Sequence, residues 1–435
     1  MRYYVYVDNF RGFSDTVIPV DDVNFLVGEN STGKSSILGL IKLFSGPAFI
    51  MGNEFDDEEV GFRHFSDMVS AHSADQTFFH IGFVPAEEKN SENVGTGCLF
   101  TFREKQGQPR LSKCTFCRGK ERVTLRFGNA TYFKRSECSA AKTAQEVISS
   151  LRSQWVAEHS GRDNGYEKLP GPTGFGSRMP IVIALSIASS ISSGKKKRGE
   201  FVLYPRDLGI VPPELTWIGP IRTEPKRTYD ELALEFSSQG RHTPYLIRRM
   251  LKSKSQAVKL KAFFERVGKA SGLFQDVKTQ SFGRGANPRF ELDVVLDGKA
   301  LNILNVGYGV SQSLPIMVEL LARERGTWFA IQEPEIHLHP RAQAALGDVL
   351  FEMAATDQKH FLVETHSDFA IDRFRMNYKR ERSNKPHSQI LFFERRDKHN
   401  IVTPLPIGKA GELPADQPES YRQFFIREQL GLLGI

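Results

Sequence analysis

The sequence is poor in cysteine and contains no apolar run long enough to span a membrane. Four cysteines among 435 residues are too few for a disulfide framework in a chain of this length, which favours a reducing compartment. The N-terminal stretch Met1–Val7 has the pattern of a strand and lacks the apolar core and cleavage site of a signal peptide. These absences predict a cytoplasmic protein with no membrane partner.

Internal repeats and sustained heptads are also missing, which argues against a solenoid or a long coiled coil. Hydrophobic residues make up 40% and charged residues 25% of the chain, as in ordinary globular proteins. A length of 435 residues suggests two lobes, or one domain with large insertions. The net charge of +7 permits a nucleic-acid partner such as DNA without establishing one.

The most informative stretch is Gly28–Ser35, which fits the phosphate-binding pattern G-x-x-x-x-G-K-[ST]. An apolar strand, Val23–Val27, precedes it, and Ser36–Phe44 follows with apolar residues at helical spacing. Glycines let backbone N–H groups turn toward an anion, and the start of the helix adds its positive dipole end. Lys34 would reach the β- and γ-phosphates of ATP, and the Ser35 hydroxyl would bind Mg²⁺. The residues expected to bind the nucleotide are Gly28, Asn30, Ser31, Thr32, Gly33, Lys34, Ser35 and Ser36.

An apolar strand that ends in an acid lies near the C-terminal side. Trp328–Ile331 is followed by Gln332 and Glu333. At the end of such a strand a carboxyl group would lie beside the magnesium ion and the attacking water. We therefore predict that Glu333 orients or deprotonates that water. Gln332 is a neutral and weak candidate for a magnesium ligand.

Two further segments complete the pattern of a nucleotide hydrolase. A glycine loop, Asn305–Ser313, precedes a helix and could form a second anion site. The strand Phe361–Val363 leads to His366, which could contact the γ-phosphate or the water. A hinge or helix cap would resemble the first segment, and a structural histidine the second.

Taken together, these motifs resemble the ABC-type P-loop ATPases of the RecF/OLD/SMC-like branch, often labelled AAA-family ATPases in bacteria. The matching stretches span nearly the whole chain, although residues 90–210 contain nothing that matches. They are DNFRGF at 8–13, GENSTGKSS at 28–36, IGPIR at 218–222, NVGYGVSQ at 305–312, QEPEIHLHP at 332–340, VETHSD at 363–368 and ESYRQFF at 419–425.

The resemblance implies an α/β fold: an ABC-type head with a mixed β and parallel sheet core, plus an inserted β and helical lobe. It identifies His366 as the switch histidine and residues 335–339 as the loop that crosses a dimer seam. The family usually has an acid at the position of Gln332, so magnesium affinity or turnover is expected to be low. Gln76 is a candidate for the family's lid glutamine. The residues that look like the signature loop, which caps ATP held by a second subunit, are Gly307, Gly309, Ser311 and Gln312.

We expect residues 1–85 and 216–435 to form the ATPase head, with residues 86–215 inserted between them. Alternating patterns predict strands between Phe78 and Phe133, followed by helices over 140–195. Helical periodicity returns at 243–273. From residue 312 onward, strands and helices alternate as in a parallel sheet, with a last strand near Ile390–Phe393.

Relatives in this branch carry either long coiled coils or a C-terminal Toprim nuclease. The chain shows no long heptad run, and the stretch after His366 is too short for a Toprim domain. The expected role is therefore an ATP-driven sensor or scaffold, dimeric or larger, that controls a separate nuclease or toxin in bacterial anti-phage defence. One alternative is a RecF-like DNA-binding ATPase in repair. The other is a nucleotide-gated binding module with negligible turnover.

The cysteines leave a zinc site open. Cys114 and Cys117 form a CxxC pair, with Cys98 and Cys138 on either side. Structural zinc sites more often use two close-spaced pairs. The surrounding sequence is β-like, so the thiols are more easily interpreted as small hydrophobic side chains.

Overall fold

The computed structural model describes the chain except for residues 1, 53, 54, 56, 58, 87–94, 138–142, 160–164, 170–179, 193–211, 231–234, 284–287, 382 and 426–435. The chain forms two compact units. The first unit comprises Met1–Asp21, Glu29–Leu215 and Phe393–Pro404. The second comprises Asp22–Gly28, Thr216–Phe392 and Leu405–Ile435. The predicted division at residues 85 and 215 is a different partition and stays a prediction.

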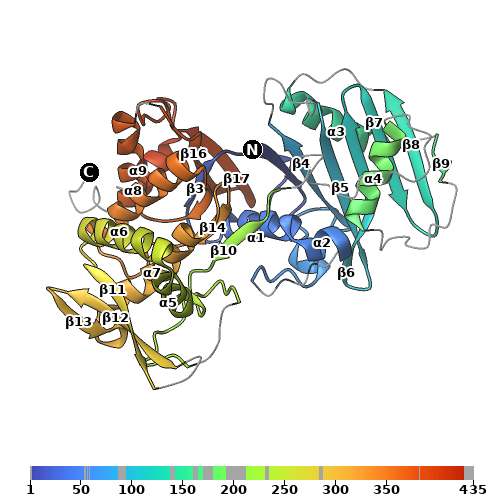
Figure 1. Cartoon of the computed structure of the whole chain (residues 1–435). Coiled ribbons are helices and arrows are strands. Elements are labelled where there is room, and N and C mark those ends of the chain that lie inside the picture. Colours follow the sequence, from blue (N-terminus) through green and yellow to red (C-terminus); the bar gives the residue numbers. More distant parts are fainter. Residues whose placement is uncertain are drawn as a thin grey trace. The chain divides into compact units, whose positions relative to one another are not determined.

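The first unit is built on an eight-stranded sheet whose neighbouring strands are all antiparallel (Figure 1). Its strands, in spatial order, are β2 (Thr16–Val20), β1 (Tyr3–Asp8), β4 (Phe78–Pro85), β5 (Gly97–Lys105), β6 (Gln108–Arg118), β7 (Glu121–Phe127), β8 (Thr131–Glu137) and β9 (Glu167–Lys168). The β-like pattern predicted between Phe78 and Phe133 is therefore confirmed. The two N-terminal strands belong to this same sheet.

Successive side chains of each strand point to opposite faces of this sheet. Helices pack against both faces. On one face, Phe44 of α1 (Lys34–Ser45) packs against Phe83 of β4 and Phe102 of β5. On the other face, Val147 of α3 (Ala144–His159) shares a buried cluster with Leu99. The remaining helical elements are α2 (Pro47–Gly52), η1 (Phe65–Asp67) and α4 (Ile181–Ser192), the last of which packs on β6 and β7.

The predicted parallel sheet lies mostly in the second unit, although Phe393–Pro404, in its last two strands, belong to the first. Its strand order is β10 (Leu215–Ile218), β14 (Trp328–Gln332), β15 (His360–Glu364), β3 (Val23–Gly28), β16 (Ser388–Arg396) and β17 (His399–Pro406). β14 pairs with β15, and β15 with β3, in parallel. The prediction that Ile390–Phe393 is the last strand was wrong. Asp397 and Lys398 both adopt positive φ, 47° and 71°, and this two-residue turn leads directly into β17.

Helices and a small sheet complete the second unit (Figure 1). Its helices are α5 (Thr243–Lys252), α6 (Lys254–Ser271), η4 (Ile303–Asn305), α7 (Tyr308–Ala322), α8 (Pro340–Asp357), α9 (Asp368–Arg380) and α10 (Glu419–Phe424). The antiparallel strands β11 (Asp276–Phe282), β12 (Arg289–Leu296) and β13 (Lys299–Asn302) form a separate sheet. The predicted Asp297-Gly298 hairpin turn joins β12 to β13, with φ of 46° and 75°. The mixed α/β class is confirmed. Over the described residues, no helix combines the length and apolarity needed to cross a membrane.

Candidate functional site

The predicted phosphate loop forms a tight turn around a buried lysine. In the first unit, Ser31 and Gly33 adopt left-handed backbone conformations with φ of 64° and 95°. Gly33 is the N-cap of α1 and offers no side-chain cap, so no side chain of the cap residue occupies the first N–H groups of the helix. Lys34 is only 4% exposed, and its Nζ donates to the Glu29 carbonyl oxygen at 2.8 Å. A positive side chain at an uncapped helix start suits the phosphates of a nucleotide.

Contacts within the first unit explain why residue 33 must be glycine. A Cβ at this position would lie 2.5 Å from Phe13 and 2.9 Å from Asn400. Asn400 is itself fixed, because its Nδ2 donates to the Arg11 carbonyl oxygen at 3.0 Å. The FRGF part of the N-terminal motif therefore packs closely around the glycine of the phosphate loop.

The other predicted nucleotide-binding residues surround this turn. Thr32 is buried, and its hydroxyl donates to the Glu29 carbonyl oxygen at 2.8 Å. Asn30, Ser31 and Ser35 are exposed and Ser36 is half-buried. Gly28 ends β3 in the second unit, and the chain enters the first unit at Glu29.

In the second unit, the carboxyl ends of β14, β15 and β3 form one edge. The register places Gln332 opposite Glu364, and Glu364 opposite Leu26, two residues before Gly28. Gln332 Nε2 donates to Glu364 Oε2 at 3.0 Å. Glu333 leaves the strand with φ of 43°, and its backbone N–H donates to the Glu364 carbonyl oxygen at 2.8 Å. Parallel strands thus bring Gly28, Gln332 and Glu333 to the same edge, which we call the acidic edge.

Glu335 ties the loop after β14 to the end of β15. Its carboxylate accepts hydrogen bonds from the Thr365 hydroxyl at 2.8 Å and from the His366 backbone N–H at 2.6 Å. Burial raises the pKa of Glu335, although these two hydrogen bonds act in the opposite direction. The His366 ring is exposed and stacks with Phe424 at a centroid distance of 6.4 Å. His366 therefore lies at the acidic edge with its ring exposed.

Arg222 is a further candidate site residue. In the sequence it stands out only as the last residue of the IGPIR motif. It is 3% exposed, and its Nη2 donates to the Gln332 carbonyl oxygen at 3.1 Å. Its Nε and Nη1 are buried without a hydrogen-bond partner among the described residues. Burial lowers the pKa of Arg222 to about 10, although Glu335 and Glu333 act in the opposite direction. The sequence feature that could have identified Arg222 is its position just after a strand that ends in Gly-Pro.

The predicted signature loop begins α7 and contacts the loop after β14. Gly307 is the N-cap of α7, and a Cβ on Gly309 would lie 2.6 Å from the His337 carbonyl oxygen. The Tyr308 and His337 rings meet edge to face at 4.9 Å. Ser311 and Gln312 are buried, at 6% and 3% exposure, whereas Gly307 and Tyr308 are exposed. The start of α7 is therefore the exposed part of the predicted signature loop.

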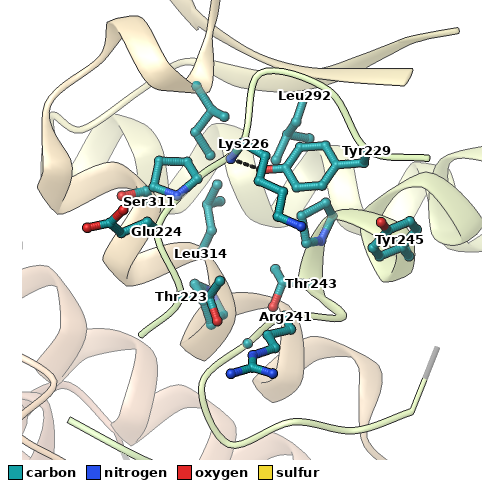
Figure 2. A pocket seen from close by; sticks show the side chains of 15 residues that line it. Thr223, Glu224, Lys226, Tyr229, Arg241, Thr243, Tyr245, Leu292, Ser311 and Leu314 are labelled. Atoms are coloured by element: carbon teal, nitrogen blue, oxygen red, sulfur yellow. Dashed lines mark hydrogen bonds between the residues drawn. The ribbon is translucent and has the colours of Figure 1, made fainter. Parts of the chain in front are cut away.

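A pocket of about 390 Å³ lies on another side of α7 (Figure 2). Tyr229 and Leu292 line one end, and Arg241 and Thr243 the other. The backbone N–H of Lys226 donates to the Tyr229 hydroxyl at 3.0 Å. Ser311 is the one predicted site residue in its described lining. The pocket is therefore distinct from the acidic edge.

The cysteines and Gln76 lie in the first unit. Cys98, Cys114 and Cys117 are buried thiols in β5 and β6. Burial raises the pKa of Cys98 to about 12. The described residues contain no cluster of three metal-binding side chains, and Cys138 lies outside them. Gln76 Nε2 donates to the Ala71 carbonyl oxygen at 2.9 Å in an exposed loop.

Comparison with protein families gives two matches. Residues 205–372 match the family described as "AAA domain, putative AbiEii toxin, Type IV TA system", and residues 1–94 match "AAA ATPase domain". Together they support a P-loop ATPase of the AAA type, and the ATPase resemblance predicted from the motifs is confirmed. No curated protein matches the sequence.

Several solved structures are similar to the chain. A crystal structure of the SMC head bound to the C-winged helix domain of ScpA matches at 12% identity and TM-score 0.43, covering 94% of this chain and 98% of that chain. The SMC head domain from Thermotoga maritima matches at 12% identity and TM-score 0.36, covering 93% and 99%. An SMC head with an extended coiled coil, bound to the C-terminal domain of ScpA derived from Pyrococcus furiosus, matches at 13% identity and TM-score 0.39, covering 94% and 98%. Similarities at this level of identity and TM-score do not indicate what the chain binds.

Proposed function

We propose that this chain is an ABC-type ATPase that binds ATP with Mg²⁺, hydrolyses it slowly and forms a homodimer or higher homo-oligomer on nucleotide. The observation that carries the proposal is the phosphate turn around buried Lys34. The strand that leads into this turn, β3, shares its parallel sheet with the acid-bearing end of β14. Both family matches, to AAA-type ATPase domains, support the same activity.

Different residues of the chain have different proposed roles in binding and hydrolysing ATP. Lys34 and the start of α1 bind the phosphate charge. The Ser35 hydroxyl and the Gln332 amide oxygen are candidates to hold Mg²⁺, and the donor set fits because Gln332 Nε2 is already committed to Glu364. A Mg²⁺ ion held by these residues would supply neutralisation of the nucleotide's phosphate charge. Glu333 orients the attacking water, and His366 contacts the γ-phosphate.

We propose that the ATPase acts as a cytoplasmic sensor or scaffold that controls a separate nuclease or toxin in bacterial anti-phage defence. The name of the family matched at residues 205–372 includes a toxin and a Type IV TA system, which supports a two-component arrangement. In this view the start of α7, with Gly307 and Tyr308 exposed, caps the nucleotide of a second copy. A nucleotide-gated module with negligible turnover is the second candidate, favoured by the neutral side chain of Gln332.

The decisive experiment measures the mass in solution with and without ATP and Mg²⁺, after co-expression with the neighbouring genes. Wild type and Glu333→Gln are compared, with Lys34→Ala as the control that should not bind nucleotide. We expect an ATP-dependent dimer, trapped by Glu333→Gln, and a second polypeptide in the complex. A monomer that ignores ATP would refute the nucleotide-dependent dimer, and isolation without any partner would count against the effector. Salt-sensitive duplex DNA binding with ATP would instead favour the RecF-like alternative.

A further inference from the structure

The acid that usually precedes the catalytic glutamate is missing from β14, but an acid stands beside that position on the next strand. Gln332 and Glu364 are directly opposite each other in the parallel register. Cross-strand neighbours project from the same face of a sheet. The pair therefore presents one carboxylate and one amide at the acidic edge.

The hydrogen bond between them fixes which group faces which way. A carboxylate only accepts, so Gln332 must direct its NH₂ group to Glu364, and the distance is 3.0 Å. The Glu364 residue is 5% exposed. The negative charge of the pair is thus held, nearly buried, on β15 rather than on β14. β15 is also the strand directly beside β3, which continues into the phosphate loop.

Magnesium at a nucleotide needs this charge, because it is typically held by one or two carboxylates together with the phosphates and water. Gln332 cannot provide it. Glu333 is one residue further along and leaves the strand with φ of 43°. Glu335 is engaged by Thr365 and the backbone of His366. Glu364 is the carboxylate of this row that stands directly opposite Gln332, on the strand beside β3.

We propose that Glu364 supplies the negative charge that holds the hydrated magnesium ion of a bound nucleotide, with Gln332 as its orienting partner. The acid therefore stands on β15 rather than on β14, where the family usually has it. This inference rests on the proposed function, since it concerns the ion that accompanies ATP. It removes the reason, given by Gln332 alone, to expect a weak magnesium site.

The test is a cycle of four proteins: wild type, Glu364→Gln, Gln332→Glu and the swap Gln332→Glu/Glu364→Gln. Glu364→Gln is informative because a glutamine oxygen can still accept from Gln332, so the hydrogen bond remains and only the charge is lost. The readout is the affinity for a fluorescent ATP analogue, measured in EDTA and then across a magnesium titration. Glu352→Gln on α8, which removes a half-buried glutamate paired with Arg266, is the matched control.

We expect Glu364→Gln to raise the magnesium concentration at half-effect about 10- to 100-fold, the usual range for loss of a metal-supporting group. Affinity in EDTA should stay unchanged, and the swap should return the magnesium midpoint close to that of wild type. An unchanged midpoint in folded Glu364→Gln, or a folded swap that does not recover, would overturn the inference. If wild type binds no nucleotide in EDTA or in magnesium, the proposed function itself fails, which the same titration reveals.

Discussion

Replacing Gly309 by alanine should loosen the contact between the start of α7 and the loop of residues 335–339. The added Cβ would lie 2.6 Å from the His337 carbonyl oxygen, whereas ordinary contacts begin near 3.4 Å. The neighbour is backbone rather than the end of a flexible side chain. His337 also holds a positive φ of 64°, so the loop cannot adjust by changing a rotamer alone.

Two opposing effects set the size of the change. Alanine is favoured over glycine inside a helix by about 0.5–1 kcal/mol. Overpacking against a fixed neighbour costs about 1–3 kcal/mol. The central values of these two ranges leave a local destabilisation of about 1.25 kcal/mol, or roughly 8-fold in the equilibrium for opening the contact. The clash should therefore outweigh the gain in helix propensity.

Hydrogen exchange followed by mass spectrometry measures this directly, because local opening exposes amides in contiguous segments. Peptides that cover residues 303–314 and 333–340 should exchange faster in Gly309→Ala, by that factor. Gly219→Ala is the control: this glycine is buried in the second unit, whereas Gly309 is half-buried, and its Cβ would meet nothing closer than 4.0 Å. Unchanged exchange in Gly309→Ala, or an equal change in Gly219→Ala, would refute the reasoning.

Three further predictions concern buried charges. Burial opposes ionisation of Glu319, but hydrogen bonds from His242 (2.6 Å) and Arg323 (2.7 Å) outweigh it and lower its pKa. The resulting stability is present above the ordinary pKa of 4.5 and is lost as the pH falls below it. Urea titrations should show this loss in wild type, and Glu319→Ala should cost about 3 kcal/mol at neutral pH. Arg222→Met should slow ATP turnover about tenfold or more while nucleotide affinity persists, since it removes a buried cation beside the acidic edge; equal turnover would contradict this. Lys34→Ala should weaken nucleotide binding about tenfold or more in the same fluorescence titration, and binding at wild-type affinity would remove the phosphate turn from the site.

The sequence predicts best those elements whose signals are local. The pattern of Val23–Val27, glycine loop and apolar helix specified β3, the phosphate turn and α1, because each depends on neighbours along the chain. The hairpin at Asp297-Gly298 followed from turn chemistry in the same way. The strand β17 was missed, since Asp397-Lys398 is not a strong turn signal although both residues adopt positive φ.

Burial at the candidate site could not be predicted by local rules. The motif placed Ser311 and Gln312 in the signature loop, yet both side chains lie inside the second unit. Whether a residue in the first turns of a helix faces outward depends on what packs against that helix. Here α7 packs against α5. Arg222 was missed for a related reason, because its role depends on Gln332, a residue 110 positions away.

The pair of Gln332 and Glu364 shows where a motif-by-motif analysis is misleading. A motif assigns a role to each position along one strand, so a glutamine before the catalytic acid is interpreted as a lost magnesium ligand. A bound ion, however, meets the edge of the sheet, where residues from neighbouring parallel strands stand in one row. The charge of that row is what the ion experiences, and the register keeps one carboxylate in it at residue 364. A substitution on one strand can therefore be offset by an acid on the next. Since the two residues are 32 positions apart, only the pairing of the strands shows that an acid lies beside Gln332.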